Sequence, residues 1–78
     1  EREFEGVISA IGLDHFILFG RKFYVTETTE IKDKNDDAIS LVTFYLLATN
    51  KQIEVEAREI NGELYATKIE LEDSDDDD

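Results

Sequence analysis

Residues 52–72, QIEVEAREINGELYATKIELE, contain the pattern that decides the fold class of this chain. Apolar and polar side chains alternate along 52–58, as they do in a strand with one buried and one solvated face. Asn61-Gly62 is the dipeptide that most favours a two-residue β-hairpin turn. Residues 63–72 alternate again. The sequence therefore predicts a long antiparallel hairpin here.

The second strand of this hairpin carries two apolar sets that an unbroken strand would place on opposite faces. Leu64 and Ala66 share one face and Ile69 and Leu71 share the other, because side chains alternate along a strand. Burial of both sets requires one extra residue between them. The pattern therefore predicts a bulge or strong coiling near Thr67.

The N-terminal part is also predicted to be β-structure. Residues 3–11 (EFEGVISAI) mix β-branched and apolar residues and predict a strand, in which Gly6 favours a bulge or a sharp bend. Turns and short strands follow: a turn at 12–14, strands at 15–19 and 22–25 around a hairpin signal at Gly20-Arg21, and a short strand at 28–31.

The middle of the chain is less decisive. The polar residues 33–37 (DKNDD) predict a loop. Residues 38–48 (AISLVTFYLLA) combine helical spacing of apolar residues with β-branched and aromatic residues, so helix and strand both stay open. The spacing favours a short helix over 40–47, capped by Asp37 or Ser40.

Five or six short strands with at most one short helix predict an all-β chain. A short sheet removes its exposed edges by closing, so we expect a small closed or partly open barrel. The barrel domain is predicted to span residues 1–72. Residues 73–78 (DSDDDD) contain no apolar side chain and are expected to form a disordered acidic tail.

Charge and composition restrict the partners. The 78 residues include 20 Asp+Glu against 8 Lys+Arg, a net charge of −12. Nucleic-acid binding depends on Lys and Arg that neutralise phosphates, so we expect no nucleic-acid partner. No apolar run reaches the roughly 18 residues of a membrane span, so we expect no membrane insertion. The chain lacks Met, which indicates a piece of a longer protein that contacts neighbouring domains or a protein partner.

Four segments resemble a family of bacterial extracytoplasmic domains of unknown function: 4–11 (FEGVISAI), 53–57 (IEVEA), 61–62 (NG) and 66–72 (ATKIELE). The resemblance covers residues 3–72. It implies a small five- to six-stranded OB-like β-barrel, often present as tandem copies in exported proteins. It also implies a periplasmic, secreted or cell-surface location. It implies no catalytic residues, because none are assigned to the family.

Asp33-x-Asn35-x-Asp37 opens like an EF-hand calcium loop. That loop requires Gly at its sixth position and a bidentate Glu at its twelfth, where this chain has Ala38 and Phe44. The sequence therefore favours a solvated loop, with weak calcium binding through Asp33, Asn35 and Asp37 as the alternative. We expect no cofactor other than this weak calcium.

The best candidate for ligand binding is a small group of basic and aromatic residues. Arg21 and Lys22 form a basic pair beside Tyr24, and Tyr65 is the other tyrosine whose phenol end suits the surface. Such a group could bind an oligosaccharide or, ranked behind it, single-stranded nucleic acid. The phenylalanines are expected to fill the core.

No residue pattern supports catalysis. His15 is the only histidine, and it lacks the partners of a triad or a zinc site. Glu54 and Glu56 are expected to form a solvated strand face rather than a glycosidase pair. The chain is therefore interpreted as a non-enzymatic extracytoplasmic module that acts as a structural spacer or docking domain. The alternatives are the ligand-binding module and the calcium-responsive element.

Overall fold

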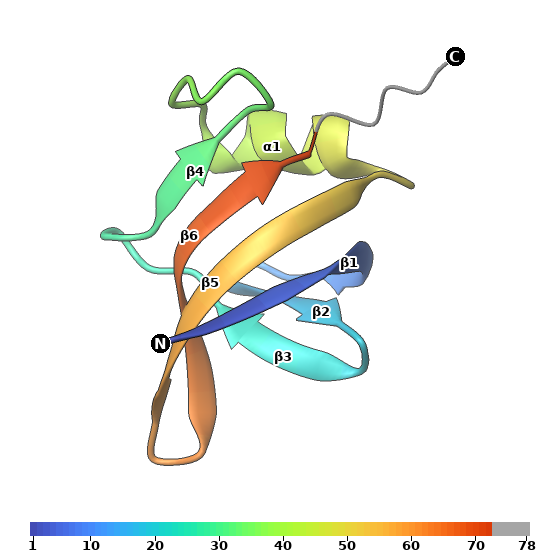
Figure 1. The fold of residues 1–78 in the computed structure, drawn as a ribbon. Helices are drawn as coiled ribbons and strands as arrows, with labels where there is room; N and C mark the ends of the chain where they lie inside the picture. The colour runs from blue at the N-terminus through green and yellow to red at the C-terminus, as the bar shows by residue number, and fades with distance from the viewer. Residues whose placement is uncertain (73–78) are drawn as a thin grey trace.

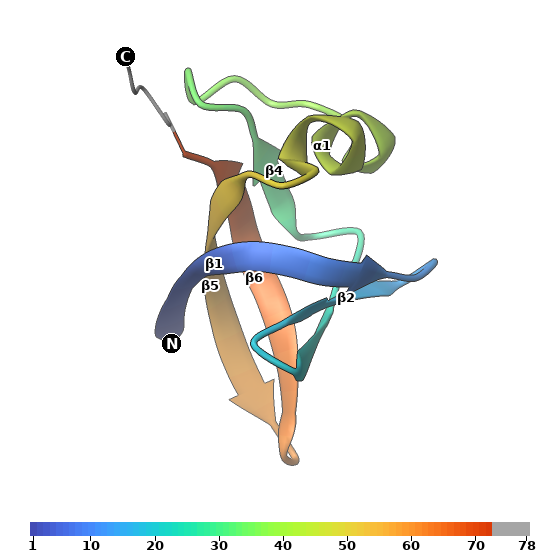
Figure 2. The same ribbon diagram turned by 90° about the vertical axis from the view of Figure 1, so that its right-hand side faces the viewer.

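The computed structural model describes residues 1–72, and the predicted tail at 73–78 lies outside the described residues. It contains six strands and one helix: β1 (Arg2–Ile11), β2 (His15–Leu18), β3 (Arg21–Tyr24), β4 (Glu30–Lys32), α1 (Leu41–Ala48), β5 (Gln52–Ile60) and β6 (Glu63–Leu71). Figures 1 and 2 show α1 above one end of the strands and the β5–β6 hairpin projecting at the other.

The strands form a closed barrel. β1 pairs antiparallel with β2 on one side and with β5 on the other, and β2 and β5 pair in turn with β3 and β6. A parallel pairing of β3 with β6 closes the circle, and β4 adds beside β6, also parallel. Five strands thus make the barrel, with one short helix, and the predicted all-β class is confirmed.

The predicted bulge on β6 is confirmed. Ala57 pairs with Ala66 and Glu56 pairs with Lys68, so Thr67 is the extra residue. The bulge shifts the alternation by one position. As a result all four apolar residues of this strand are buried: Leu64, Ala66, Ile69 and Leu71.

Two details of the first hairpins differ from the predictions. Gly6 pairs regularly with Ile53, and the irregularity of β1 lies instead at Ser9, between Ile8 and Ala10. The β2–β3 turn consists of Phe19 and Gly20 rather than of Gly20 and Arg21. Phe19 and Gly20 have positive φ, 55° and 70°, and the flanking residues Leu18 and Arg21 pair with each other.

The same turn explains both Gly6 and an exposed phenylalanine. Phe19 is 68% exposed, so the expectation that every phenylalanine fills the core was wrong for this residue. Its ring lies over Gly6, where a Cβ would come within 2.7 Å of Phe19 Cζ. Gly6 therefore provides room for a ring rather than a bend.

The ambiguous segment forms the helix that its spacing favoured. The Ser40 side chain caps α1 by accepting the N–H of Thr43, at 3.1 Å. Phe44 and Ala48 are buried and anchor the helix on the barrel. Among residues 1–72, no helix is long and apolar enough to cross a membrane.

The core fills the barrel interior and the contact with α1. Its largest fully buried side chains come from four strands and the helix: Phe16, Leu18, Phe23, Phe44, Ile53, Val55 and Ile69. β2, β5 as far as Ala57, and β6 bury alternate residues, with a shift at the β6 bulge, so the residues between them form the outer surface of these strands.

Candidate functional site

An aromatic row crosses the outer surface where the barrel closes. Register pairs join His15 to Tyr24, Tyr24 to Tyr65 and Tyr65 to Arg58, so these four residues lie in line across β2, β3, β6 and β5. The tyrosine rings are stacked, with centroids 5.1 Å apart and planes at 26°. His15 meets the other side of Tyr24, with ring centroids 6.5 Å apart.

Basic groups flank this aromatic row. The Lys22 Nζ lies 5.3 Å from the Tyr24 ring centroid, a cation–π distance. Arg58 is exposed at the other end of the row. Arg21 does not join it: its guanidinium lies 5.4 Å from the ring centroid of Phe4. The structure thus brings together Lys22, Tyr24 and Tyr65 and separates Arg21 from them.

The tyrosine pair also has a structural role. Only two register pairs, Phe23 with Leu64 and Tyr24 with Tyr65, join β3 to β6. Cross-strand aromatic pairs stabilise a sheet by about 0.2–1 kcal/mol. Both tyrosines are half-buried and cover one face of each other, so their ring edges and hydroxyls are what this surface offers to a ligand.

The three residues predicted to bind calcium lie in one loop, where the Asp33 carboxylate already accepts hydrogen bonds from the backbone. Asp33 Oδ1 accepts the backbone N–H of Asn35 at 2.8 Å and of Asp37 at 3.0 Å. These bonds close the loop from within, while the side chains of Asn35 and Asp37 are exposed. Within the described part of the chain, no three His, Cys, Asp or Glu side chains cluster in a way that could hold a metal ion.

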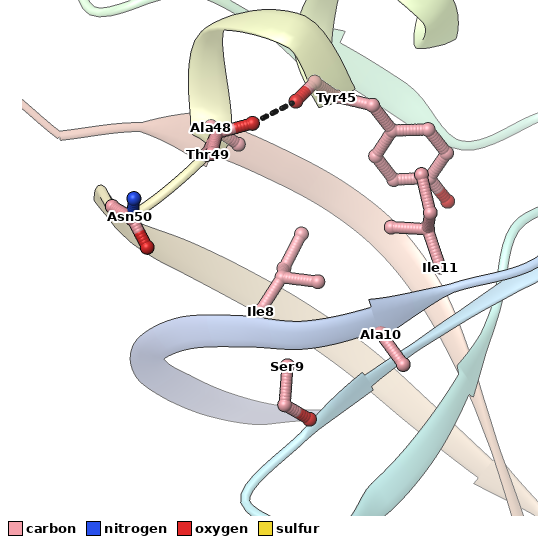
Figure 3. Close-up of a pocket in the computed structure, with 8 residues that line it drawn as sticks. All are labelled: Ile8, Ser9, Ala10, Ile11, Tyr45, Ala48, Thr49 and Asn50. Atoms are coloured by element: carbon pink, nitrogen blue, oxygen red, sulfur yellow. Dashed lines mark hydrogen bonds between the residues drawn. The ribbon is translucent and has the colours of Figure 1, made fainter.

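A shallow groove of about 200 Å³ lies between α1 and the end of β1 (Figure 3). Ile8 and Ile11 line it from β1, and Tyr45 and Ala48 line it from α1. The Tyr45 hydroxyl donates a hydrogen bond to the His15 carbonyl, at 3.3 Å, which ties the helix to the β1–β2 hairpin. Burial raises the pKa of Tyr45, so this hydroxyl keeps its proton.

The two elements that form this groove, α1 and the β1–β2 hairpin, also carry exposed large apolar side chains. On α1 these are Val42 and Leu46, which are 69% and 75% exposed. Leu47, which is 50% exposed, lines a different hollow together with Lys34 and Leu71. Ile11 and Leu13, on the hairpin beneath the helix in Figure 2, are 57% and 100% exposed. We call Val42, Leu46, Ile11 and Leu13 the apolar face.

Residues 5–70 match the family model of a domain of unknown function, DUF5666. The chain belongs to the DUF5666 family. No curated protein and no solved structure gives a significant match. The family match confirms that the chain is a domain of unknown function, and the structure confirms the small β-barrel.

The DUF5666 domain also carries a row of carboxylates, which crosses β1, β5 and β6. Glu5, Glu54 and Glu70 are direct cross-strand partners on β1, β5 and β6. Burial raises the pKa of Glu54, and neighbouring carboxylates, Glu5 and Glu70 among them, raise it further. Burial and a hydrogen bond with Glu5 raise the pKa of Glu72 in the same way.

Replacing Glu54 with glutamine is expected to stabilise the DUF5666 domain near pH 7 by about 0.5 kcal/mol, because like charges directly opposite each other destabilise a sheet. The raised pKa means that the folded state holds this proton more tightly. The destabilisation of the folded state by ionised Glu54 is therefore complete above the folded-state pKa and absent below the unfolded-state pKa of about 4.3.

The advantage of Glu54→Gln should consequently shrink as the pH falls from 7 to 4, measured by urea unfolding. Glu27→Gln is the matched control, since Glu27 is exposed between β3 and β4 and lies outside the carboxylate row. Equal stabilisation by both variants would show that net charge, rather than the cross-strand row, is responsible.

Sequence reasoning missed His15 and Arg58 as members of the aromatic row. Each is paired with one tyrosine inside a hairpin, His15 with Tyr24 and Arg58 with Tyr65, but only the β3–β6 pairing, between strands far apart in sequence, joins the two tyrosines into one row. The parallel β3–β6 pairing has no local turn signal. The two hairpins were the available signals, because they pair His15 with Tyr24 and Arg58 with Tyr65.

Proposed function

We propose that this domain is a non-catalytic docking module of a larger protein and that the apolar face contacts its partner. The observation that carries the proposal is the composition of α1. This helix contains no charged residue, and three of its eight residues are exposed leucine or valine. In a chain with a net charge of −12, such an uncharged surface marks an interaction site.

The groove supports the same function. It is lined by residues of both α1 and β1, Ile11 of the apolar face among them, so it lies between the helix and the hairpin that carry the apolar face. A non-catalytic role is supported by the one histidine, whose Nδ1 lies 3.0 Å from Asp14 Oδ1 on an open sheet surface. That hydrogen bond lowers the pKa of Asp14, as expected of an exposed carboxylate that accepts a hydrogen bond.

We further propose an OB-like barrel. Three features support it: β1 is shared between β2 and β5, β3 runs parallel to β6, and α1 lies between β3 and β5 in sequence. The bacterial origin, the tandem copies and the periplasmic, secreted or cell-surface location are proposed from the sequence resemblance alone. Fractionation of cells that express the parent protein tests the location.

The docking function is tested by site-specific photo-crosslinking in those cells. A photoreactive residue at Leu46 is expected to give one discrete adduct, identified by mass spectrometry and lost when Val42→Lys is added. The same residue at Glu63, which is exposed in the β5–β6 hairpin at the other end of the barrel from α1, is the matched control. Identical labelling at both positions would refute the docking function.

A second candidate function is favoured by the aromatic row. Lys22 and Arg58 beside two tyrosines suit an anionic oligosaccharide, for which the rings supply stacking and the cations supply charge. A titration with a galacturonic acid hexamer, followed by ¹H–¹⁵N spectra, should shift the row and fail for Lys22→Glu. A neutral maltohexaose of the same length is the control. Equal shifts with both sugars would exclude charge recognition.

A further inference from the structure

The end of β1 has a free edge beside the groove. Residues 2–7 of β1 pair with β5, whereas residues 8–11 pair with β2 alone among the strands of the described chain. β5 begins at Gln52, opposite Val7. Residues 49–51, which connect α1 to β5, do not pair with β1. The groove therefore occupies the place that a longer β5 would fill.

The hydrogen-bonding direction of this edge follows from the hairpin. Gly12 donates its N–H to the His15 carbonyl at 2.8 Å, and the next register pair is Ile11 with Phe16. Bonded and non-bonded pairs alternate in an antiparallel ladder. The N–H and C=O of Ile11 consequently point away from β2, toward the open edge.

The surroundings of the groove are suited to one kind of segment. Its walls are mostly apolar, from Ile8, Ala10, Ile11, Tyr45 and Ala48, with Ser9, Thr49 and Asn50 as the polar residues. The last turn of α1 carries no basic residue, so the partial negative charge of the helix C-terminus has no cation of its own in that turn. Together with the net charge of −12, these features favour an apolar strand flanked by basic residues.

We propose that the groove binds an extended, basic-flanked segment of the partner protein, which adds as a strand to residues 8–11 of β1. This inference rests on the proposed docking function and names the partner's chemistry. Strand addition supplies main-chain hydrogen bonds from the edge, while pockets beside it select alternate side chains. A second copy of the chain is disfavoured, because two copies would each bring the same large negative charge.

The test uses a capped hexapeptide of alternating valine and threonine with a lysine at each end, titrated into ¹⁵N-labelled protein. Saturable shifts are expected at residues 8–11 and 49–50. Ile11→Pro removes the outward N–H without touching the bonds to β2, and it should weaken binding about tenfold, the equivalent of one lost hydrogen bond. Ile11→Val keeps the N–H and should bind as the parent does.

Two further measurements complete the design. The same peptide with alternate backbone nitrogens methylated keeps its charge and side chains but should not bind. The spectrum of free Ile11→Pro must match that of the parent outside residues 8–12, which shows that the variant is folded.

Several outcomes would overturn strand addition. Unchanged affinity for Ile11→Pro or for the methylated peptide would show that the peptide binds by charge or side chains alone. Absence of shifts at millimolar peptide would also refute it, as would dimerisation through the same residues in sedimentation. Shifts confined to Val42 and Leu46 would refute it too. In each case the docking function is judged separately, by the crosslink at Leu46.

Discussion

Replacing Phe23 with alanine is expected to lower the free energy of unfolding by about 3–5 kcal/mol. The Phe23 side chain is fully buried. Its ring stacks on Phe16 with centroids 5.3 Å apart and meets the edge of Phe4 at 4.9 Å. Its backbone pairs with Leu64, one of the two register pairs that close the barrel. The substitution therefore opens a cavity at the closure itself.

This loss is a large fraction of the stability of so small a domain. Proteins are stable by about 0.05–0.15 kcal/mol per residue, so a chain of this size has roughly 4–12 kcal/mol in total. We expect Phe23→Ala to be unfolded or nearly so at 37 °C, as measured by urea unfolding followed by circular dichroism. Phe23→Leu, which leaves a smaller cavity, should cost about 1–2 kcal/mol and remain measurable.

Phe19→Ala is the matched control for this prediction. It removes the same side chain at a position that is 68% exposed, where surface substitutions change stability by about 0.5 kcal/mol or less. Similar losses for the two alanine variants would contradict the burial argument. They would mean that the contact of Phe19 with Gly6 stabilises the barrel as strongly as the core does.

The parts of the fold that the sequence predicted are those with a local cause. Asn61 and Gly62 have φ of 54° and 82°, the positive values that a type I′ turn requires and that this dipeptide tolerates. The bulge at Thr67 followed from alternation alone, because both apolar sets had to be buried. The helix start followed from the hydroxyl of Ser40, which caps it.

The parts that the sequence did not predict depend on distant pairings or on uncovered surfaces. The parallel contact of β3 with β6 joins Tyr24 to Tyr65, and neither a turn motif nor a residue spacing in the sequence predicts it. The sequence 38–48 was ambiguous because α1 is apolar on its exposed side as well as its buried side. The proposed docking function accounts for this ambiguity. A helix that packs on the barrel with one side and on a partner with the other carries apolar residues on both sides and therefore lacks an amphipathic pattern.

The gap between β3 and β4 along β6 gives the second large prediction. β3 pairs with β6 as far as Tyr65, and β4 begins to pair at Lys68. The carbonyl of Ala66 lies in between and accepts a hydrogen bond from the Thr29 hydroxyl at 2.6 Å. Thr29 is the one buried polar residue among those described, and its side-chain oxygen also accepts the N–H of Thr26, at 2.9 Å.

Thr29→Val is expected to cost about 1–3 kcal/mol, because a buried carbonyl and an amide lose their partner while the shape of the side chain is kept. Thr29→Ser retains the hydroxyl and loses one methyl group, worth about 0.8 kcal/mol when fully buried. Urea unfolding should therefore rank serine above valine, and hydrogen exchange should accelerate at residues 66–68 in the valine variant.

The reverse ranking would assign the role of Thr29 to packing of its methyl group and leave the gap in β6 without a bridge. The expected ranking has a structural consequence beyond stability. β6 joins the barrel closure at β3 to the added strand β4, which leads to the loop and α1. If a single hydroxyl bridges the two pairings, the position of α1, and with it the groove and the apolar face, depends on that hydrogen bond.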